Sequence, residues 1–187
     1  MEIEARDGEA RAGVLRTPHG GVETPTFMPV GTKGTVKGLT PGDLDSAKVG
    51  VVLGNTYHLY LRPGADLVRE AGGLHGFTGW KGPMLTDSGG YQVFSLGHRR
   101  KISERGVEFA SVYDGSSHFF TPELATRVQE DLGADIAMVL DECPPASASR
   151  EYHAESLRRT ARWARRCKEA HSRQDQALFG IVQGGLY

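Results

Sequence analysis

The chain has 187 residues and a mass of 20.3 kDa, with 39% hydrophobic and 24% charged residues, a balance typical of one globular domain with a hydrophobic core. The formal net charge of −1 excludes a generally basic surface, so any contact with nucleic acid would need a local patch. No apolar run approaches the roughly 20 residues of a membrane helix, and the two cysteines form no CxxC pair, so we expect a cytoplasmic protein without a membrane partner.

The N-terminal part predicts a small ribbon followed by a first parallel unit. Short alternating stretches over residues 1–23 indicate an antiparallel ribbon. The apolar segment Pro25 to Val30 predicts a strand. Thr40 followed by Pro41 predicts the N-cap and first residue of a helix that stops at Gly50.

The middle of the chain repeats this pattern once and then departs from it. A strand over 51–53 is followed by a helix over about 63–71, and a further strand runs from Met84 to Asp87. Residues 100–120 alternate around an Asp114-Gly115 turn, which predicts an antiparallel insertion.

The C-terminal part predicts two further strands and two helices. One helix begins at Thr121 and stops at Gly133, and strands are expected over 136–140 and 178–182. A long helix is expected from Ser149 to about Ser172. Its inward face is expected to carry Ala154, Leu157, Ala161 and Ala164.

Each predicted strand ends at a residue that can form hydrogen bonds. These residues are Thr32, Asn55, Asp87, Asp141 and Gln183. In a parallel sheet such residues share the C-terminal edge, where barrel enzymes hold their active sites. We therefore expect an α/β fold, a partial (β/α)8 TIM barrel with about five of eight units; an open five-stranded sheet is the alternative.

The residues at these strand ends suit a purine-like base. The carboxylates of Asp87 and Asp141 can accept its adjacent N–H donors, and the Gln183 amide can complement a carbonyl oxygen. Tyr91 offers a ring for stacking. The predicted substrate-binding residues are Asp87, Ser88, Gly89, Gly90, Tyr91, Asp141, Gln183 and Gly184.

The alternative is that the same residues have only structural roles. An Asp beside glycines is often only a turn or a helix cap, and an isolated cysteine such as Cys143 is more often inert than nucleophilic. A metal cluster of His58, Asp87, Asp141 and Glu142 has no ligand spacing to support it.

Two charged segments also have alternative readings. The segment Gly31-Thr32-Lys33-Gly34 lacks the ending of a phosphate-binding loop and is read as a turn. The long helix is rich in cations, which form either a solvated face paired with Glu155 and Glu169 or an RNA-backbone patch. These cations are Arg158, Arg159, Arg162, Arg165, Arg166 and Lys168.

The run MLTDSGGYQVFSL at 84–96 resembles the signature of the bacterial-type tRNA-guanine transglycosylases, also called queuine tRNA-ribosyltransferases. Seven further stretches match the family in the same order. They are TPTFMPVGTKGTVKGLTP (24–41), VVLGNTYHLYLRPG (51–64), GGLHGFTGW (72–80), RKISERGVEF (100–109), DGSSHFFTPE (114–123), DIAMVLDECPP (135–145) and LFGIVQGG (178–185).

This resemblance implies a function and a set of roles. In the family, guanine at the tRNA wobble position is exchanged for a 7-deazaguanine, in queuosine biosynthesis, through a covalent ribosyl-enzyme. The resemblance assigns proton transfer to Asp87, base recognition to Asp141 and contact with the base carbonyl to Gln183. The expected partners are tRNA with guanine at that position, guanine or a 7-deazaguanine base, and a second subunit in a homodimer.

The resemblance also implies that two parts of the family's enzymes are missing from residues 1–187. The family's nucleophilic Asp and its cysteine-rich zinc site lie in the C-terminal half. Residues 1–187 would then be the N-terminal part of a single TIM-barrel domain without the zinc subdomain, and inactive alone.

Two other classes of function stay open. One is a non-catalytic base- or tRNA-binding accessory subunit. The other is a metal-dependent barrel hydrolase, which would need a metal bound by these residues.

Overall fold

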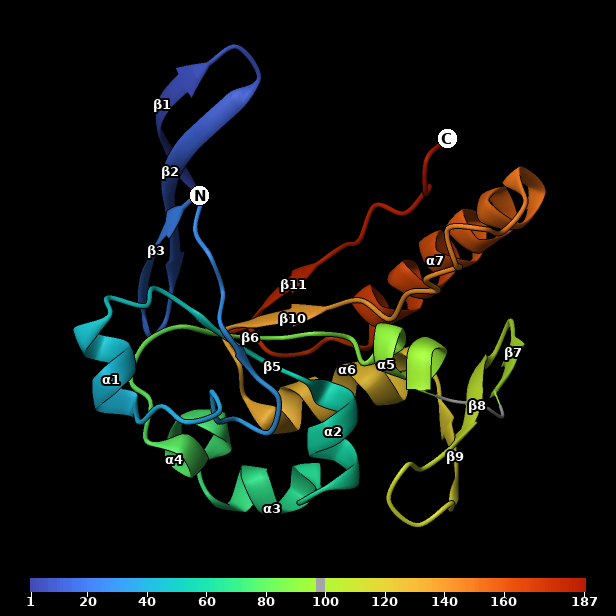
Figure 1. The fold of residues 1–187 in the computed structure, drawn as a ribbon, viewed down its shortest axis with the longest axis horizontal. Helices are drawn as coiled ribbons and strands as arrows, with labels where there is room; N and C mark the ends of the chain where they lie inside the picture. Colours follow the sequence, from blue (N-terminus) through green and yellow to red (C-terminus); the bar gives the residue numbers. More distant parts are fainter. Residues whose placement is uncertain (97–99) are drawn as a thin grey trace.

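A computed structural model describes residues 1–96 and 100–187 and has a central sheet of five parallel strands (Figure 1). The strands are β4 (Val30–Gly31), β5 (Val52–Gly54), β6 (Met84–Thr86), β10 (Ile136–Met138) and β11 (Ala177–Phe179). They lie in the order β11-β10-β6-β5-β4. Neighbours in the sheet are thus consecutive parallel strands along the chain, as in the wall of a barrel.

Helices connect these strands and cover one face of the sheet. They are α1 (Pro41–Ser46), α2 (Thr56–Leu61), α3 (Ala65–Glu70), α4 (Gly73–Thr78), α5 (Gly90–Leu96), α6 (Pro122–Leu132) and α7 (Arg150–Ala170). In Figure 1, α3, α4 and α6 lie below the sheet. The core between helices and sheet is formed by fully buried side chains of one cluster: Leu59 of α2, Val68 of α3, Leu74 of α4, Leu132 of α6 and Met84 of β6.

Two helix boundaries follow directly from the sequence. The N-cap predicted at Thr40 is confirmed, and Thr40 and Asp43 form the reciprocal hydrogen bonds of a capping box; α1 ends at Ser46, however, and not at Gly50 as predicted. The Thr121 hydroxyl accepts a hydrogen bond from the Leu124 N–H at 3.2 Å, and α6 ends at Gly133 with φ +69°. No helix in the described ranges is long and apolar enough to cross a membrane.

The expected N-terminal ribbon is confirmed as β1 (Glu2–Asp7), β2 (Ala10–Thr17) and β3 (Gly20–Thr24), all antiparallel. Its β2–β3 turn is fastened to the sheet by His19, whose Nδ1 lies 2.8 Å from Oδ1 of the buried Asp135. Oδ2 of that carboxylate accepts a hydrogen bond from the Met84 N–H at 2.8 Å and lies 3.4 Å from His75 Nε2. Burial opposes ionisation of Asp135, but its hydrogen bonds with His75, Met84 and His19 together hold its pKa below the ordinary value.

The expected insertion is confirmed as an antiparallel sheet of β7 (Arg100–Ser103), β8 (Gly106–Ala110) and β9 (Ser117–Phe120). Phe109 and Phe120 from this sheet pack with Trp163 of α7 in one buried cluster. The Trp163 indole N–H also donates to the Glu104 carbonyl at 2.9 Å. The insertion is therefore packed against α7.

Several predicted element boundaries were wrong. The strand expected over 25–30 shrinks to β4 because Pro25 and Pro29 have no N–H to donate to a neighbouring strand. The helix expected over 63–71 is present as the shorter α3, but the flanking helices α2 and α4 were not expected; Pro63 separates α2 from α3. The predicted strands over 136–140 and 178–182 become β10 and β11, of three residues each.

The inward face predicted for α7 was only partly right, because Ala164 packs against the core but the fully buried residues are others. The buried side chains are His153, Ser156, Thr160, Trp163 and Cys167, whereas Leu157 is 41% exposed. The indole is the largest apolar group on the helix, and the Ser156 and Thr160 hydroxyls find partners in the interior. Burial of that ring together with satisfied hydroxyls outweighs burial of small alanines, so the helix turns a different face inward.

This orientation of α7 can be tested by paired alanine substitutions. Trp163→Ala should lower the free energy of unfolding by about 3–5 kcal/mol because it leaves a cavity in the core. Leu157→Ala, on the exposed face, should change it by less than about 1 kcal/mol. Urea unfolding followed by circular dichroism measures both. Equal losses, or a larger loss for Leu157, would contradict the observed face.

Candidate functional site

Asp87 lies directly after β6, and donors from two neighbouring segments hold its carboxylate. Oδ2 accepts from the Asn55 amide at 2.5 Å and the Gln92 amide at 2.9 Å. Oδ1 accepts from the N–H groups of Thr56 at 2.9 Å and Gly89 at 3.1 Å. The strand ends predicted to be neighbours are therefore in direct contact.

The Asp87 carboxylate combines a raised pKa with a full set of hydrogen bonds. Burial raises its pKa, and the bonds from Asn55, Thr56, Gln92 and Gly89 oppose that shift only in part. A carboxylate has about four acceptor positions. Since four donors already reach Asp87, accepting a proton from a ligand requires one of them to move away.

Asp141 follows β10 and is held more loosely. Oδ1 accepts from the Ser88 hydroxyl at 2.7 Å, and Oδ2 accepts from the Gln183 amide at 2.5 Å. Asp141 is only 6% exposed, so its carboxylate is buried at the end of the sheet. Burial raises its pKa, and the charge of Asp87 adds to the shift. With two donors in place, Asp141 keeps acceptor positions for a ligand.

Glycine at position 90 permits the approach of Asp141. A Cβ on Gly90 would lie 2.6 Å from Asp141 Oδ1 and 2.7 Å from the Asp141 carbonyl oxygen, far inside contact distance. Gly89 has φ +78°, a backbone conformation that favours glycine. The two glycines therefore let the turn after β6 fit closely against the end of β10.

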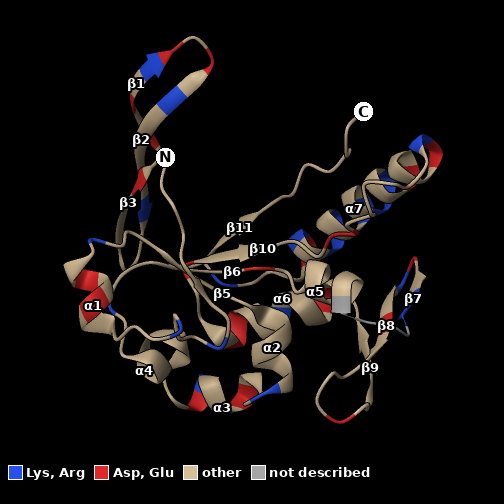
Figure 2. Cartoon of the chain, viewed as in Figure 1, with Lys and Arg blue, Asp and Glu red and all other residues tan. Residues whose placement is uncertain are grey.

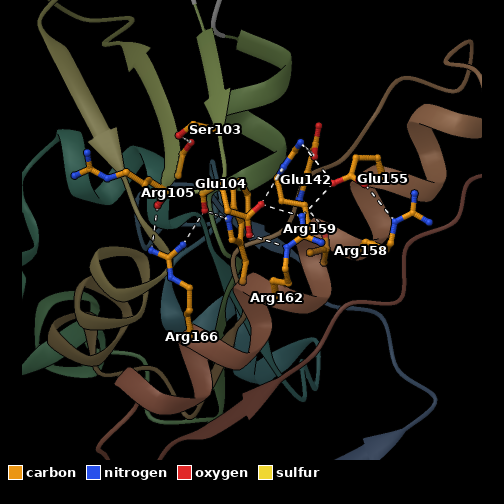
Figure 3. A network of polar contacts seen from close by, with 12 residues as sticks. Ser103, Glu104, Arg105, Glu142, Glu155, Arg158, Arg159, Arg162 and Arg166 are labelled. Atoms are coloured by element: carbon orange, nitrogen blue, oxygen red, sulfur yellow. Dashed lines mark hydrogen bonds and ion pairs between the residues drawn. The ribbon is translucent and has the colours of Figure 1, made fainter.

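The residue after Asp141 is anchored in α7. Glu142 is fully buried, and its two carboxylate oxygens accept from the Tyr152 hydroxyl and the Arg159 guanidinium, each at 2.5 Å. Its backbone N–H donates to Thr160 and its carbonyl accepts from Ser156 (Figure 3 shows the Glu142–Arg159 contact). These bonds fix the backbone from which the Asp141 side chain projects.

Tyr91, which follows Gly90 in the chain, is 64% exposed. Its side chain lines a hollow of about 300 Å³ together with Phe94, Arg100, Cys143 and Pro144. That volume lies at the lower end of the range for small-molecule sites. A flat ligand there would meet the Tyr91 ring, and the hollow reaches the segment of Asp141 through Cys143, two residues further along the chain.

The structure thus brings most predicted site residues together. Asp87, Ser88, Gly89 and Gly90 form one turn; Ser88 donates to Asp141, and Gln183 donates to the other oxygen of the Asp141 carboxylate. Gly184 follows Gln183 with φ +138°. The part played by Gln92 was missed, although its position five residues after Asp87, in the first turns of α5, was a usable signal.

The arginines of α7 are largely engaged in ion pairs. Arg162 binds Glu104 at 2.7 Å and Glu155 at 3.0 Å, and Arg166 binds Glu123 at 2.7 Å. Figure 2 accordingly shows acidic and basic residues mixed along this helix. The pairing with Glu155 is confirmed, and it favours the solvated-face reading over the RNA-backbone patch.

The described residues offer one group of three potential metal ligands, and it lies away from the site. It consists of His19, His75 and Asp135. The two imidazole rings are stacked 3.5 Å apart with 12° between their planes. A metal bound in the plane of one ring would lie well outside the plane of the other. The arrangement therefore suits a structural contact between the N-terminal ribbon and the sheet, and it does not suit a metal centre.

A cysteine-rich zinc site does not fit these residues. The chain has two cysteines. Cys167 is buried in the core and Cys143 lines the hollow beside Tyr91, so they lie in different surroundings. The expected zinc ligands are therefore not supplied by residues 1–187.

Comparison with known proteins finds one family throughout. The family model described as queuine tRNA-ribosyltransferase matches residues 7–187. Proteins named queuine tRNA-ribosyltransferase are 61% identical in Halothermothrix orenii and 60% identical in Desulforamulus reducens over all of this chain, which covers 49% and 50% of their lengths. One from Thermus thermophilus is 61% identical over 99% of the chain and 48% of its own length. The chain therefore spans about half the length of these relatives.

The raised pKa of Asp141 predicts a pH-dependent effect on stability. Because the folded state holds the Asp141 proton more tightly than the unfolded state, the contribution of Asp141 to wild-type stability should fall as pH rises from about 4 through the folded pKa. Asp141→Asn should therefore gain stability over wild type as pH rises to 7, by about 1.4 kcal/mol for each unit of pKa shift.

Urea unfolding at several pH values measures this difference. Asp45→Asn, at an exposed position of α1, is the matched control. A constant difference between Asp141→Asn and wild type across this range would show that the Asp141 pKa is not raised.

Proposed function

Since this chain belongs to the queuine tRNA-ribosyltransferase family, we propose that residues 1–187 form the base-binding part of a tRNA-guanine transglycosylase. The observation that carries this proposal is the meeting of Asp141, Ser88 and Gln183 at the ends of adjacent strands, beside Asp87. In this arrangement a carboxylate, a hydroxyl and an amide converge in a largely buried place, as recognition of a polar base edge requires.

The free acceptor positions on Asp141 suit the adjacent N–H donors of guanine. Binding would replace the Gln183 amide N–H on Oδ2, which leaves Gln183 free to turn toward the base carbonyl. Tyr91 would cover one face of the base from the hollow that it lines with Cys143. Ser88 and Gly90 keep the carboxylate in place during this exchange.

Asp87 is the proposed group for proton transfer. Its pKa is raised by burial, which brings protonation closer to neutral pH. Because four donors occupy its oxygens, we propose that the Asn55 or Gln92 side chain swings away when the base enters. Asp87 would then accept or donate a proton at the displaced base.

The carboxylate nucleophile is proposed to lie outside residues 1–187, in the part that the longer relatives possess, together with the zinc ligands. We propose that this part also continues the sheet into a (β/α)8 barrel. Among the described residues β11 pairs only with β10, and a groove of about 490 Å³ runs between β11 and α7. Both features suit a further strand and helix. A homodimer remains a proposal for the longer protein.

Base binding tests the proposal directly. Calorimetric titration should show that the wild-type chain binds guanine and discriminates against adenine. Asp141→Asn should weaken guanine binding by roughly 1.5–3 kcal/mol, because a hydrogen-bonded charge is lost. Asp45→Asn should bind as wild type does. Equal affinity for guanine and adenine, or an Asp141→Asn variant with unchanged affinity, would contradict the proposal.

The location of the nucleophile is tested by base exchange. The purified 187-residue chain should fail to incorporate labelled guanine into tRNA, since it lacks the proposed nucleophile. The same assay on one of the longer relatives is the positive control. Incorporation by the short chain would show that residues 1–187 contain a complete catalytic centre.

A further inference from the structure

The ring of Tyr113 contacts two cationic side chains from different parts of the chain. Lys33 Nζ lies 4.7 Å and Arg62 Cζ lies 4.8 Å from the ring centroid, both within the range of cation–π attraction. Lys33 belongs to the turn after β4, Arg62 follows α2, and Tyr113 lies in the loop between β8 and β9. Three segments far apart in sequence therefore hold two positive charges together.

Lys33 and Arg62 differ from the ion-paired arginines of α7 in their charged neighbours. Within the described ranges, no carboxylate oxygen lies within 4.0 Å of the Lys33 or Arg62 nitrogens, whereas Arg159 is ion-paired with the buried Glu142. Both side chains belong to exposed residues. Asp114 has a pKa of about 2, caused first by hydrogen bonds from Ser116 and Ser111, with a small contribution from the Arg62 charge.

Lys33 and Arg62 lie close to the end of the sheet that holds Asp87 and Asp141. The Tyr113 hydroxyl is 3.1 Å from Nδ1 of His58, on the same short helix as Thr56, whose N–H holds Asp87. Burial lowers the His58 pKa, the Lys33 charge lowers it further, and the Asp87 charge opposes both. His58 is therefore within electrostatic reach of Lys33 on one side and Asp87 on the other.

We propose that Lys33 and Arg62, held against Tyr113, bind a backbone phosphate of the RNA whose base enters the pocket of Asp87 and Asp141. This inference rests on the proposed function. A base placed at the strand ends carries its sugar and phosphates toward the rim of the pocket, where unpaired cations would meet them. The Arg62 guanidinium can donate two N–H hydrogen bonds to phosphate oxygens, and Lys33 adds a second positive charge.

The salt dependence of RNA binding tests this inference. The probe is an RNA hairpin with guanosine in its loop, titrated with the 187-residue chain at several salt concentrations. Each of Lys33→Ala and Arg62→Gln should lower the slope of log affinity against log salt by about 0.7, the value for one contact with single-stranded RNA, and weaken binding several-fold at low salt. Lys81→Ala, an exposed position before β6 at the opposite end of the strands, should leave the slope unchanged.

The role of the Tyr113 ring is tested by two substitutions of that residue. Tyr113→Phe keeps the aromatic face and should retain the wild-type slope, although it loses the contact with His58. Tyr113→Leu removes the face and should lower the slope as loss of a cation does. Slopes that stay at the wild-type value in Lys33→Ala, Arg62→Gln and Tyr113→Leu would overturn the proposal.

Free guanine separates this inference from the proposed function. The affinity of the chain for guanine alone should be the same in wild type, Lys33→Ala and Arg62→Gln, since the base carries no phosphate. A fall in guanine affinity in both variants would show that they disturb the base pocket and would overturn a phosphate role. Failure of wild type to bind guanine would count against the base pocket itself, whatever the slopes show.

Discussion

A buried carboxylate must be met by hydrogen-bond donors, and this requirement organises the end of the sheet. Asp141 receives donors from the turn after β6 and from the segment after β11. Asp87 receives its donors from the segment after β5, from its own turn and from Gln92 of α5. The two acids thereby connect the ends of four adjacent parallel strands and their loops.

Such connections need the strands to be neighbours in the right order and the backbone to approach closely. The order follows from consecutive parallel units, and the close approach follows from Gly90, where a side chain would collide with Asp141. The burial that raises both carboxyl pKa values opposes stability at neutral pH. Binding sites commonly hold such groups at the expense of stability.

Much of this arrangement could be predicted from the sequence. Apolar runs that end in Asn55, Asp87, Asp141 and Gln183 predicted both the parallel sheet and the side-by-side strand ends, because the period of strands and the position of turns are local properties. The caps at Thr40 and Thr121 were predictable for the same reason.

Features that depend on tertiary contacts could not be predicted in this way. The inward face of α7 is decided by Trp163 and by hydroxyls that meet Glu142, and no local pattern shows those partners. The ring of Tyr113 meets Lys33 and Arg62 only because the insertion folds back toward the end of the sheet. The roles of individual site residues remain predictions.

The contacts between the insertion and α7 have a consequence for how the protein could vary in evolution. Glu104 and Arg105 form the turn between β7 and β8, and their carbonyls accept from Trp163 and Arg166 of α7, the helix that also anchors Glu142 beside Asp141. Lengthening that turn would strain a chain of contacts that leads to the pocket. The turn at 104–105 should therefore keep a constant length among related proteins, because Trp163 and Arg166 bind its backbone carbonyls, which residues of any type supply, so the identity of residue 105 could change more freely than the number of residues in the turn.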